Sequence, residues 1–586
     1  MVLERINSPK DLKALSKEER KELAGEMREA LIERASRHMG HVGPDLGFVE
    51  ATIALHTVFD APEDQIVFDV SHQTYPHKML TGRREAYTDP AHYDDVGPYT
   101  DPEESPYDLF SIGHTSTSID LAIGIAKARD LLGGKESVVA VIGDGSLSGG
   151  MALEGLSVAG EMETPLILIL NDNNQSIAEN HGGIYRNLKE LRETKGEAKD
   201  NLFRAMGLEY LYEENGNDTE ALIAALQKAK TYQRPVLLHI FTRKGMGLPY
   251  AEEHKETWHW HLPFYRETGE TRKEWAEEEE DYSDFTVEFL LRKMKEDPSV
   301  LAITAGVPGG MGFTEEKRKE AGVQFVDVGI AEQSGVTLAS GAAKRGAKPV
   351  FFTSASFLQR AYDQMSHDAG INSLPITIVV NSASIFGMRD KTHLGLYLAS
   401  MASTIPNLYV LAPAFKEEYL AMLDWSLEQT ERPVLILAPS GDVLPSEVPV
   451  EKDFSKPHFH TVQEGFGAAI LAPGSLYSVG KAAAKLLKEK YGKEVTLIEP
   501  GILSHPDEEC LSALKKNHKL LVCLDDGILD GGLGEKIARY YGMDEMKVLC
   551  LGLPKDFYDE FSAEALLKEF GMDPESIAES VMEEMG

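Results

Sequence analysis

Two short apolar runs, each followed by polar turn residues, limit most strongly what this chain can fold into. The first run spans residues 138–142 and leads into a Gly-Asp-Gly turn centred on Asp144. The second spans residues 166–170 and leads into Asn-Asp-Asn, which ends at Asn173. Such runs are typical of buried parallel strands, and the segment between them has the length of a crossover helix. The sequence therefore predicts a βαβ unit, with Asp144 and Asn173 at a strand edge where open α/β sheets bind ligands.

The turn residues at this edge are suited to holding a diphosphate through a divalent cation. Gly143 and Gly145 flank Asp144, and glycine lets a backbone approach phosphate groups closely. The Asp144 carboxylate, the Asn173 side chain and the Gln175 carbonyl offer the hard oxygen ligands that Mg²⁺ prefers. A lone Gly-Asp-Gly would not separate this site from an ordinary turn, but the paired strand ends favour a ligand site.

Further stretches occur in an order that matches a known enzyme family. The stretches are residues 6–9, 40–41, 69–78, 113–118, 143–151, 171–177, 327–333 and 530–534. In these stretches the chain resembles the transketolase family of thiamine diphosphate enzymes and, within it, most closely the 1-deoxy-D-xylulose-5-phosphate synthases. The resemblance implies thiamine diphosphate and Mg²⁺ as cofactors.

The resemblance also implies an α/β fold of three successive domains. Two have the thiamine diphosphate-binding fold, and the C-terminal one is transketolase-like. Alternating strand-like and helix-like segments agree with this, and a charged stretch at 266–281 and a proline-containing stretch at 443–458 are the expected linkers. We expect a diphosphate- and magnesium-binding domain over 1–265, a pyrimidine-binding domain over 282–441 and the C-terminal domain over 459–586.

Individual elements can be predicted inside these domains. A capping box at Ser16 predicts a helix that reaches about Ser36. Beyond the opening unit, strands are expected at residues 66–70, 235–240, 325–327, 349–352, 375–380, near Ser475, 494–498 and 520–522.

The charge of the chain restricts its partners. The chain has 59 lysines and arginines against 95 aspartates and glutamates, a net charge of −36, which argues against nucleic acid or an anionic membrane. No apolar run has the length of a signal-peptide core or a membrane span, and Cys510, Cys523 and Cys550 lack metal-ligand spacing. We expect a cytoplasmic protein with small-molecule substrates, and the resemblance implies a homodimer.

The resemblance assigns cofactor roles residue by residue. Glu332 matches the glutamate that hydrogen-bonds the aminopyrimidine ring, a role that suits a carboxyl group whose pKa is raised in an apolar cleft. Phe357 matches the aromatic that stacks on this ring, although core packing is the better explanation from the sequence alone. Ile177 presses beneath the thiazolium or simply belongs to the core. Lys244 would bring positive charge to the diphosphate. The cofactor-binding positions also include Gly143, Gly145, Ser146 and His114.

Histidines suit a reaction in which oxygen atoms repeatedly gain and lose protons near neutral pH. His41, His72 and His393 match family positions around the substrate, and His114 lies nearer the cofactor. His259 is a further candidate in a Trp-His-Trp-His stretch, where His261 could take its place.

The acceptor side departs from the family pattern. Both arginines that grip the acceptor phosphate in the synthases are serines here, Ser382 and Ser440, and a third pocket position, usually tyrosine, is Ser354. Arg360 remains, and Arg389 stands where the family has aspartate. Each arginine–phosphate contact is worth about 1.5–3 kcal/mol, so the two losses would weaken phosphate binding by a few powers of ten.

The leading hypothesis for function is a carbon–carbon bond-forming transferase. The resemblance implies decarboxylation of pyruvate and transfer of the two-carbon unit to glyceraldehyde 3-phosphate. The alternative keeps the cofactor and moves a ketol or acyl unit, from a 2-oxo acid or ketose donor, to a different or unphosphorylated aldehyde. A 2-oxo acid dehydrogenase component and a non-enzymatic scaffold are weaker alternatives.

Overall fold

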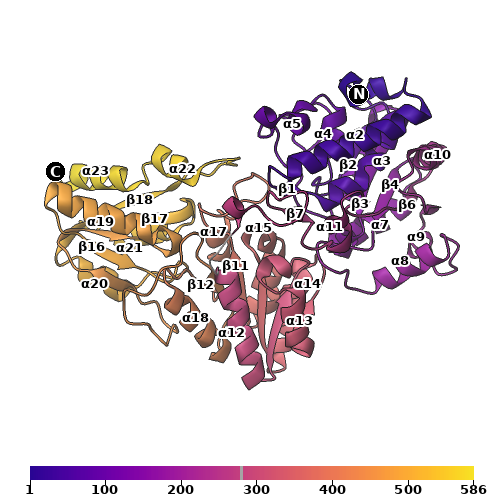
Figure 1. Ribbon diagram of the computed structural model, residues 1–586. Helices are drawn as coiled ribbons and strands as arrows, with labels where there is room; N and C mark the ends of the chain where they lie inside the picture. The colour runs from indigo at the N-terminus through magenta and orange to yellow at the C-terminus, as the bar shows by residue number, and fades with distance from the viewer. Residues whose placement is uncertain (277–280, 586) are drawn as a thin grey trace. The chain divides into compact units, whose positions relative to one another are not determined.

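The computed structural model describes residues 1–276 and 281–585 (Figure 1). Residues 277–280, part of the expected first linker, lie outside the described residues. The chain forms two compact units, which are described separately. The first comprises residues 1–276 with 329–331, and the second comprises 281–328 with 332–585.

The first unit is built on a five-stranded sheet in the order β2-β3-β4-β6-β5, with every pairing parallel. Its strands are β2 (Gln65–Phe68), β3 (Val138–Gly143), β4 (Ile167–Asp172), β5 (Glu209–Glu213) and β6 (Val236–Phe241). A short antiparallel pair, β1 (Gly40–His41) with β7 (Trp260–His261), lies outside this sheet. The expected βαβ unit is confirmed: β3, α7 and β4 follow one another, and β3 pairs with β4.

Helices cover both faces of this sheet, because its strands are apolar on both sides. On one face, α6 and α7 pack on a core that includes Ala140 and Leu168; on the other, α3 and α10 pack on a core that includes Val139 and Ile169. The helices of the unit are α1 (Pro9–Leu12), α2 (Lys17–Ala35), α3 (Gly43–Val58), α4 (Tyr75–Leu80), α5 (Glu85–Thr88), α6 (Ser118–Leu132), α7 (Gly150–Gly160), α8 (Ile184–Glu193), α9 (Leu202–Ala205), α10 (Thr219–Ala229) and α11 (Pro249–Glu253).

Two sequence predictions in this unit are refined by the structure. Helix α2 has the expected capping box between Ser16 and Glu19 and ends at Ala35. Strand β2 ends at Phe68, before the predicted end at residue 70, because Val70 takes a left-handed backbone with φ of 58°. The described part of the first linker packs back on α2, where Arg272 Nε donates to Ser36 O over 2.8 Å.

The second unit contains two further sheets. The first has six parallel strands in the order β12-β13-β11-β10-β8-β9. They are β8 (Val300–Thr304), β9 (Phe325–Asp327), β10 (Lys348–Ser354), β11 (Thr377–Asn381), β12 (Tyr409–Leu411) and β13 (Val434–Leu437). The helices around it are α12 (Tyr282–Glu296), α13 (Glu315–Ala321), α14 (Glu332–Lys344), α15 (Ala355–Leu358), α16 (Tyr362–Gln364), α17 (Leu398–Ala402) and α18 (Lys416–Glu428).

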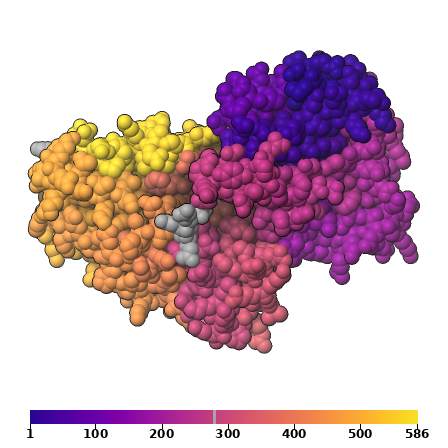
Figure 2. All heavy atoms as spheres, in the orientation of Figure 1, coloured from indigo at the N-terminus to yellow at the C-terminus, as the bar shows by residue number. Residues whose placement is uncertain are grey.

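The other sheet of this unit has five strands in the order β14-β16-β15-β17-β18, of which only the β14 pairing is antiparallel. The strands are β14 (His460–Gln463), β15 (Gly467–Leu471), β16 (Thr496–Glu499), β17 (His518–Ile528) and β18 (Lys547–Leu553). The helices are α19 (Tyr477–Tyr491), α20 (Glu508–Leu514), α21 (Leu533–Tyr541), α22 (Ala563–Glu569) and α23 (Pro574–Met585). Figure 2 shows the residues of α22 and α23, in yellow, packed closely on the orange residues of this domain.

The strand predicted near Ser475 is wrong. Ser475 lies in a 3-10 turn, Gly474–Leu476, and the strand is β15, whose apolar run ends just before Pro473. Proline has no backbone N–H to donate to the ladder, so the strand stops there. No helix among the described residues has the length and apolarity needed to cross a membrane.

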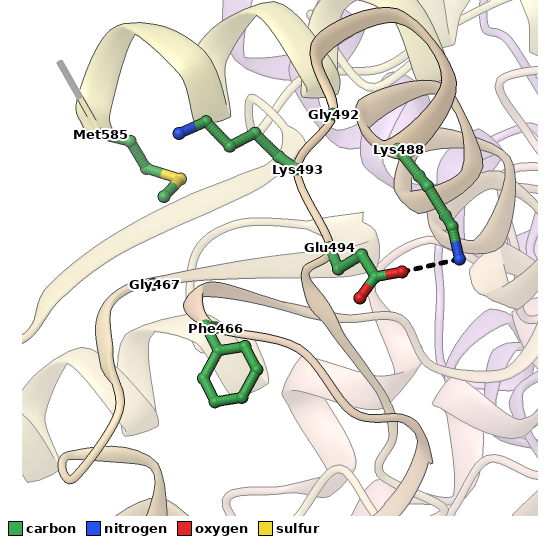
Figure 3. Close-up of a pocket in the computed structure, with 7 residues that line it drawn as sticks. All are labelled: Phe466, Gly467, Lys488, Gly492, Lys493, Glu494 and Met585. Atoms are coloured by element: carbon green, nitrogen blue, oxygen red, sulfur yellow. Dashed lines mark ion pairs between the residues drawn. The ribbon is translucent and has the colours of Figure 1, made fainter.

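A surface hollow of the C-terminal domain holds none of the candidate site residues (Figure 3). Its lining includes Phe466, Met585 and the ion pair of Lys488 with Glu494, whose Nζ and Oε1 are 2.7 Å apart. Lys488 and Glu494 are both largely exposed. We therefore assign no chemistry to this hollow.

Candidate active site

Asp144 lies at the carboxyl edge of the first sheet, immediately after β3. The β3–β4 register pairs Gly143 with Asn171, and Asp144 N donates to Asn171 O over 3.1 Å. The loops that follow the two strands therefore start side by side, as the sequence predicts. The Asp144 residue is only 2% exposed.

The Asp144 carboxylate is held by the loop that follows β4. Its Oδ2 accepts from Gln175 N at 3.1 Å and from Asn180 Nδ2 at 2.7 Å. Burial raises the pKa of the Asp144 carboxyl, and the nearby negative charge of Asp172 raises it further. Ionised Asp144 is therefore costly in this place without a bound cation.

The same loop offers amide oxygens that no hydrogen bond satisfies. Asn173 Oδ1 and Asn180 Oδ1 are buried and have no partner among the described residues. Asn174, between them, takes a left-handed backbone with φ of 58°, which asparagine tolerates better than most residues. Unsatisfied buried oxygens next to a buried carboxylate fit a small, hard cation.

Asp172, which ends β4, has a supporting part in this arrangement. Its Oδ2 lies 2.5 Å from Arg192 Nη1 and 2.9 Å from His239 Nε2, and its Oδ1 accepts from Asn174 N at 2.9 Å. Those contacts balance the charge of Asp172 and fix the turn that presents Asn173.

Lys244 brings a buried amine close to this loop. Its Nζ donates to Ser176 O over 2.6 Å, and burial lowers the pKa of the Lys244 amine to about 7. A Cβ on Gly145 would meet Ser176 Oγ at 2.6 Å, whereas a Cβ on Gly143 would meet nothing within 4 Å. Gly145 is thus needed because a side chain there would prevent the two loops from packing together. The space next to Gly143 is open.

The remaining cofactor candidates of this unit lie in the neighbouring loops. Ser146 is buried, and its carbonyl accepts from Ser116 Oγ at 2.8 Å. Ile177 is half-buried, and its carbonyl accepts from Gln175 Nε2 at 3.3 Å. His114 is half-buried in the segment just before Ser116.

Three of the predicted histidines form one cluster. The ring centroids of His41 and His72 are 5.0 Å apart, those of His72 and His259 are 5.1 Å apart, and those of His41 and His259 are 5.6 Å apart. Burial lowers the pKa of His72 to about 3 and also lowers that of His259, and in both cases the Lys244 charge adds to the effect. The His72 and His259 imidazoles are therefore neutral near pH 7.

His261 belongs to a different environment. Its ring stacks on Trp258 with a centroid distance of 4.1 Å, and its Nδ1 lies 2.6 Å from Leu262 O. By contrast, Nδ1 of His259 is buried without a hydrogen bond among the described residues. The geometry therefore assigns His259 to the histidine cluster and His261 to the packing of the β7 segment.

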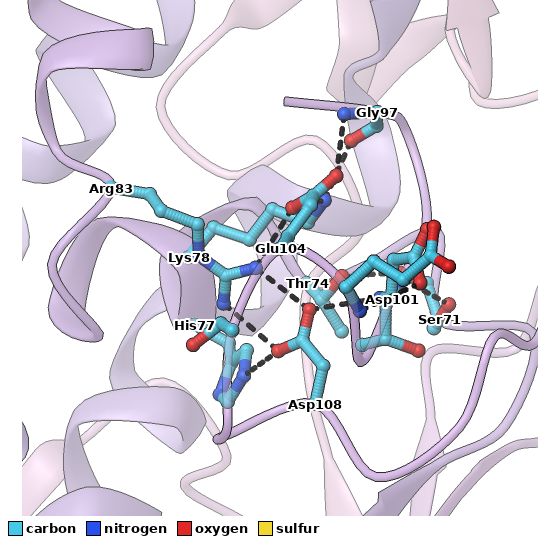
Figure 4. A network of polar contacts seen from close by, with 12 residues as sticks. Ser71, Thr74, His77, Lys78, Arg83, Gly97, Asp101, Glu104 and Asp108 are labelled. Carbon is cyan, nitrogen blue, oxygen red and sulfur yellow. Dashed lines mark hydrogen bonds and ion pairs between the residues drawn. The ribbon is translucent and has the colours of Figure 1, made fainter. Parts of the chain in front are cut away.

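A buried polar network anchors the helix that follows the His72 loop (Figure 4). His77 Nε2 lies 2.8 Å from Asp108 Oδ1, and the Arg83 guanidinium contacts both oxygens of Asp108 at 2.7 and 2.9 Å. Lys78 Nζ donates to Glu104 Oε2 over 2.7 Å in the same network. Because His77 and Lys78 lie on α4, these contacts fix the start of that helix and hence the turn carrying His72.

Glu332 is the first residue of α14 in the second unit. It is 2% exposed, and its Oε2 has no hydrogen bond among the described residues, although Arg360 Nη1 is 3.7 Å away. Burial raises the pKa of the Glu332 carboxyl, and Arg360 partly opposes this. Glu332 is therefore a buried carboxyl group that holds a proton more readily than an exposed glutamate does.

Phe357 and His393 lie together in the same unit. Their ring centroids are 5.5 Å apart in an edge-to-face arrangement, and Phe357 is half-buried. His393 Nδ1 lies 3.2 Å from Asp390 Oδ1, which orients the ring. Phe357 thus keeps part of its ring uncovered, as a residue that stacks on a ligand requires.

Comparison with known proteins identifies the family of this chain. Residues 3–199 match the model for 1-deoxy-D-xylulose-5-phosphate synthase, and 130–288, 279–444 and 458–577 match the thiamine diphosphate binding, pyrimidine binding and C-terminal domains of transketolase. The 1-deoxy-D-xylulose-5-phosphate synthases of Clostridium beijerinckii and Caldanaerobacter subterraneus are 35% and 36% identical, over 99% of both chains in each case.

The chain belongs to the 1-deoxy-D-xylulose-5-phosphate synthase family. It is a thiamine diphosphate-dependent transferase with the three-domain α/β fold of the transketolases. Among solved structures, transketolase from Leishmania mexicana is 16% identical over 97% of both chains, with a TM-score of 0.45.

A narrow cleft of the second unit is lined by residues next in sequence to two of the predicted acceptor positions. Ser382 and Ser440 directly adjoin lining residues Ala383 and Pro439. Ser382 has φ of 58°, and Ser440 N donates to Ser475 Oγ over 2.9 Å. No arginine is among the residues lining this cleft within the described part of the chain.

The charged and polar groups near this cleft do not favour a phosphate. Asp526 is one of its lining residues; it accepts from Ser384 Oγ at 2.9 Å, and burial raises the pKa of its carboxyl to about 6. Ser354 Oγ donates to Asn381 Oδ1 over 2.8 Å. Arg389 is exposed and does not line the cleft.

Sequence reasoning missed three residues of this arrangement. Asn180 follows the recognised motif by several positions, and no spacing rule pointed to it. Asp172 was inside the quoted motif, but its role depends on contacts with distant residues. Asp526 comes from β17, far along the chain from the serines of the acceptor segment.

Proposed function

We propose that this chain joins a two-carbon unit, from pyruvate with loss of carbon dioxide, to an aldehyde, with glyceraldehyde 3-phosphate as the acceptor that family membership implies. The observation that carries the proposal is the buried Asp144 carboxylate, held by a loop in which Asn173 Oδ1 and Asn180 Oδ1 are buried without partners among the described residues, an arrangement suited to a magnesium-held diphosphate. When bound, thiamine diphosphate supplies the nucleophilic carbon and the electron sink for this chemistry.

We propose that the residues of the first unit hold the metal and the diphosphate. Asp144, Asn173 and the Gln175 carbonyl would coordinate Mg²⁺, with Lys244 adding positive charge. Gly143, Gly145, Ser146, His114 and Ile177 would line the cofactor. The support is the fit between these donor atoms and a hard cation, together with the raised pKa of the Asp144 carboxyl, which a cation would reverse.

Glu332 is proposed to hold a proton against the aminopyrimidine ring, on which Phe357 would stack. A carboxyl with a raised pKa can share a proton with a ring nitrogen without remaining permanently charged. The positive charge of Arg360 partly opposes the effect of burial on the pKa of the Glu332 carboxyl.

The histidine cluster is proposed to move protons at substrate oxygens. Neutral His72 and His259 can each donate from one ring nitrogen and accept at the other, and the His41 ring lies against both. In the second unit, His393, oriented by Asp390, is proposed for the same kind of proton transfer because it matches a family position around the substrate.

The two histidines of the β7 segment give a matched test of this role. We expect His259→Ala to lower kcat by about 10²–10⁴-fold, the usual loss for a general acid or base, with an unchanged melting temperature. We expect His261→Ala to keep kcat within a few fold and to lower the melting temperature, since the Trp258 stack is lost. Steady-state kinetics and thermal melting measure both, and the reverse pattern would reassign the two residues.

The acceptor side supports a second candidate: a transketolase-like enzyme that uses a different or unphosphorylated aldehyde. Ser354, Ser382 and Ser440 replace the groups that bind the acceptor phosphate in the family, and Asp526 adds an acidic group to the cleft. The serines themselves supply no positive charge to a phosphate dianion. Arg360 and Arg389 remain as the candidate basic contacts.

Restoring the two arginines tests this second candidate. We expect the double variant Ser382→Arg with Ser440→Arg to lower KM for phosphorylated aldehydes by about 10²-fold or more, because each contact is worth about 1.5–3 kcal/mol. KM for the matching unphosphorylated aldehydes should stay within a few fold, which serves as the control. Equal changes for both acceptor classes would contradict the assignment of these positions to the phosphate.

A donor and acceptor screen tests the proposed function itself. Purified protein with thiamine diphosphate and MgCl₂ is given pyruvate or a ketose and a series of phosphorylated and free aldehydes. Carbon dioxide release from pyruvate together with a five-carbon sugar product is expected with glyceraldehyde 3-phosphate. Product from a ketose donor alone would favour the second candidate, and acyl transfer to lipoamide would favour a dehydrogenase component. No turnover with any pair would favour a scaffold.

Three further properties of the chain are proposed: its domain limits, its oligomeric state and its compartment. The domain limits are proposed as 1–265, 282–441 and 459–586. A homodimer is proposed from family membership. A reducing cytoplasm is proposed because Cys510, Cys523 and Cys550 are free thiols whose pKa values are raised by burial, which makes them unreactive.

A further inference from the structure

Three buried side chains that have no part in the proposed reaction meet inside the second unit. Glu418 comes from α18 beside the six-stranded sheet, while His460 and Glu499 come from β14 and β16 of the C-terminal sheet. His460 and Glu499 are direct partners in the antiparallel β14–β16 register. One ligand atom from each of the three lies within 4.8 Å of the other two.

The carboxylates of this cluster each keep one oxygen unsatisfied. Glu418 Oε2 accepts from Ala414 N at 3.1 Å, and Glu499 Oε1 accepts from Gly501 N at 2.8 Å. The other two oxygens, Glu418 Oε1 and Glu499 Oε2, are buried without a hydrogen bond among the described residues. Glu418 is 3% exposed and Glu499 is 0% exposed. Glu418 Oε1 lies 4.0 Å from His460 Nε2.

The protein supplies no positive side chain to balance these carboxylates. Within the described ranges, neither Glu418 nor Glu499 pairs with a lysine or arginine, and the nearest basic group is His460, whose Nε2 is 4.0 Å from Glu418 Oε1. Burial raises the pKa of both carboxyls, and the charge of Glu418 and a side-chain interaction with Glu418 raise that of Glu499 further, so that one proton between the two carboxyls is the alternative to a cation. Two buried like charges with free oxygens need a proton or a cation between them.

The histidine favours the cation. Burial lowers the pKa of His460, so its imidazole is neutral and has a lone pair to offer. A proton shared by two carboxyls needs no third ligand, whereas two carboxylate oxygens and one imidazole nitrogen form a usual ligand set for Zn²⁺ and related ions.

A second group of ligands lies on the solvent side of the same histidine. Glu451, His458 and His460 also place one ligand atom each within 4.8 Å of one another. His458 is exposed and Glu451 is half-buried. His460 therefore joins an outer, solvent-accessible group to the buried one, which provides an entry path for an ion.

We propose that Glu418, His460 and Glu499 bind a divalent transition-metal ion of the Zn²⁺ type. The ion ties α18 to the β14–β16 edge and so joins the pyrimidine-binding and C-terminal domains. This site is independent of the proposed magnesium and thiamine diphosphate site, and its test does not depend on turnover.

Zinc titration of the intact protein tests the site. The protein is stripped with EDTA, saturated with thiamine diphosphate and MgCl₂, and titrated with ZnCl₂ by calorimetry; bound zinc is counted by mass spectrometry after gel filtration. We expect one Zn²⁺ per chain that excess Mg²⁺ does not displace. We also expect Zn²⁺ to raise the melting temperature by several degrees, as ligand binding to the folded state does.

Two variants locate the site. Glu499→Gln keeps the side-chain shape, and its amide can donate to Glu418 Oε1, so the variant should fold; we expect its zinc affinity to fall at least about 100-fold and its zinc-dependent thermal shift to vanish. His458→Ala, the matched control from the outer group, should retain the bound zinc. The proposal is overturned if the wild type binds no zinc, if Glu499→Gln binds it as tightly, or if only His458→Ala loses it.

Discussion

Glu332→Gln is expected to lower kcat by about 10²–10⁴-fold while leaving the affinity for thiamine diphosphate within a few fold. The amide keeps the volume of the side chain, so packing at the start of α14 is preserved. It cannot exchange a proton with the aminopyrimidine ring, and loss of that exchange removes a general acid–base contribution of this size. Steady-state kinetics with the best donor and acceptor pair, and calorimetry with the cofactor, provide the measurements.

A matched control separates this role from a helix-terminus effect. Glu316 lies in the first turn of α13, as Glu332 does in α14, but it is exposed. Glu316→Gln should therefore leave kcat unchanged, since it loses only a surface charge near a helix N-terminus. Full turnover by Glu332→Gln would remove this carboxyl from the mechanism.

The strand edge that holds Asp144 could be predicted from sequence because its signal is local. Apolar runs followed by glycine or asparagine report buried strand ends without knowledge of the rest of the chain. The same kind of local pattern predicts a strand near Ser475, but the apolar run ends before Pro473 and the residues after it form a turn. The strand predicted to reach residue 70 ends at Phe68, because the sequence around Val70 does not indicate its left-handed backbone.

Site residues that depend on long-range contacts were harder to predict. His259 and His261 are two positions apart in one stretch, and only the stacking of His261 on Trp258 separates them. Asn180 contacts Asp144, and Asp172 contacts Arg192. No spacing of residues in the sequence indicates either contact. Composition and local patterns therefore predict the cofactor chemistry, but they do not predict all of the contacts around the cofactor site.

The buried cluster of Glu418, His460 and Glu499 is the group of residues that is hardest to predict from the sequence. Its members come from one helix and two strands, and none lies in a recognised motif. Glutamate at position 418 is in the first turn of α18, where the helix dipole alone would explain it. The strand register sets His460 opposite Glu499, and α18 adds Glu418 to this pair.

Asp144→Ala is expected to weaken magnesium-dependent binding of thiamine diphosphate by at least about 100-fold. Removing the charged partner of a buried cation costs roughly 3–5 kcal/mol, and each 1.4 kcal/mol is a factor of ten in affinity. Calorimetric titration of the cofactor in saturating MgCl₂ measures the loss. Glu179→Ala, an exposed carboxylate in the same loop, should bind the cofactor as the wild type does, and unchanged affinity in Asp144→Ala would contradict the metal assignment.

The raised pKa of the Asp144 carboxyl adds a pH dependence to this result. Because the folded-state pKa lies above the unfolded one, burying the ionised carboxylate costs stability that grows as pH rises between these values. A bound cation offsets that cost, so cofactor and Mg²⁺ should stabilise the wild type more at pH 8 than at pH 5, and their affinity should fall as pH decreases. The isosteric Asp144→Asn protein has no carboxyl there to titrate. Its melting temperature without metal should equal or exceed that of the wild type at pH 8, and its weak cofactor binding should lose this pH dependence.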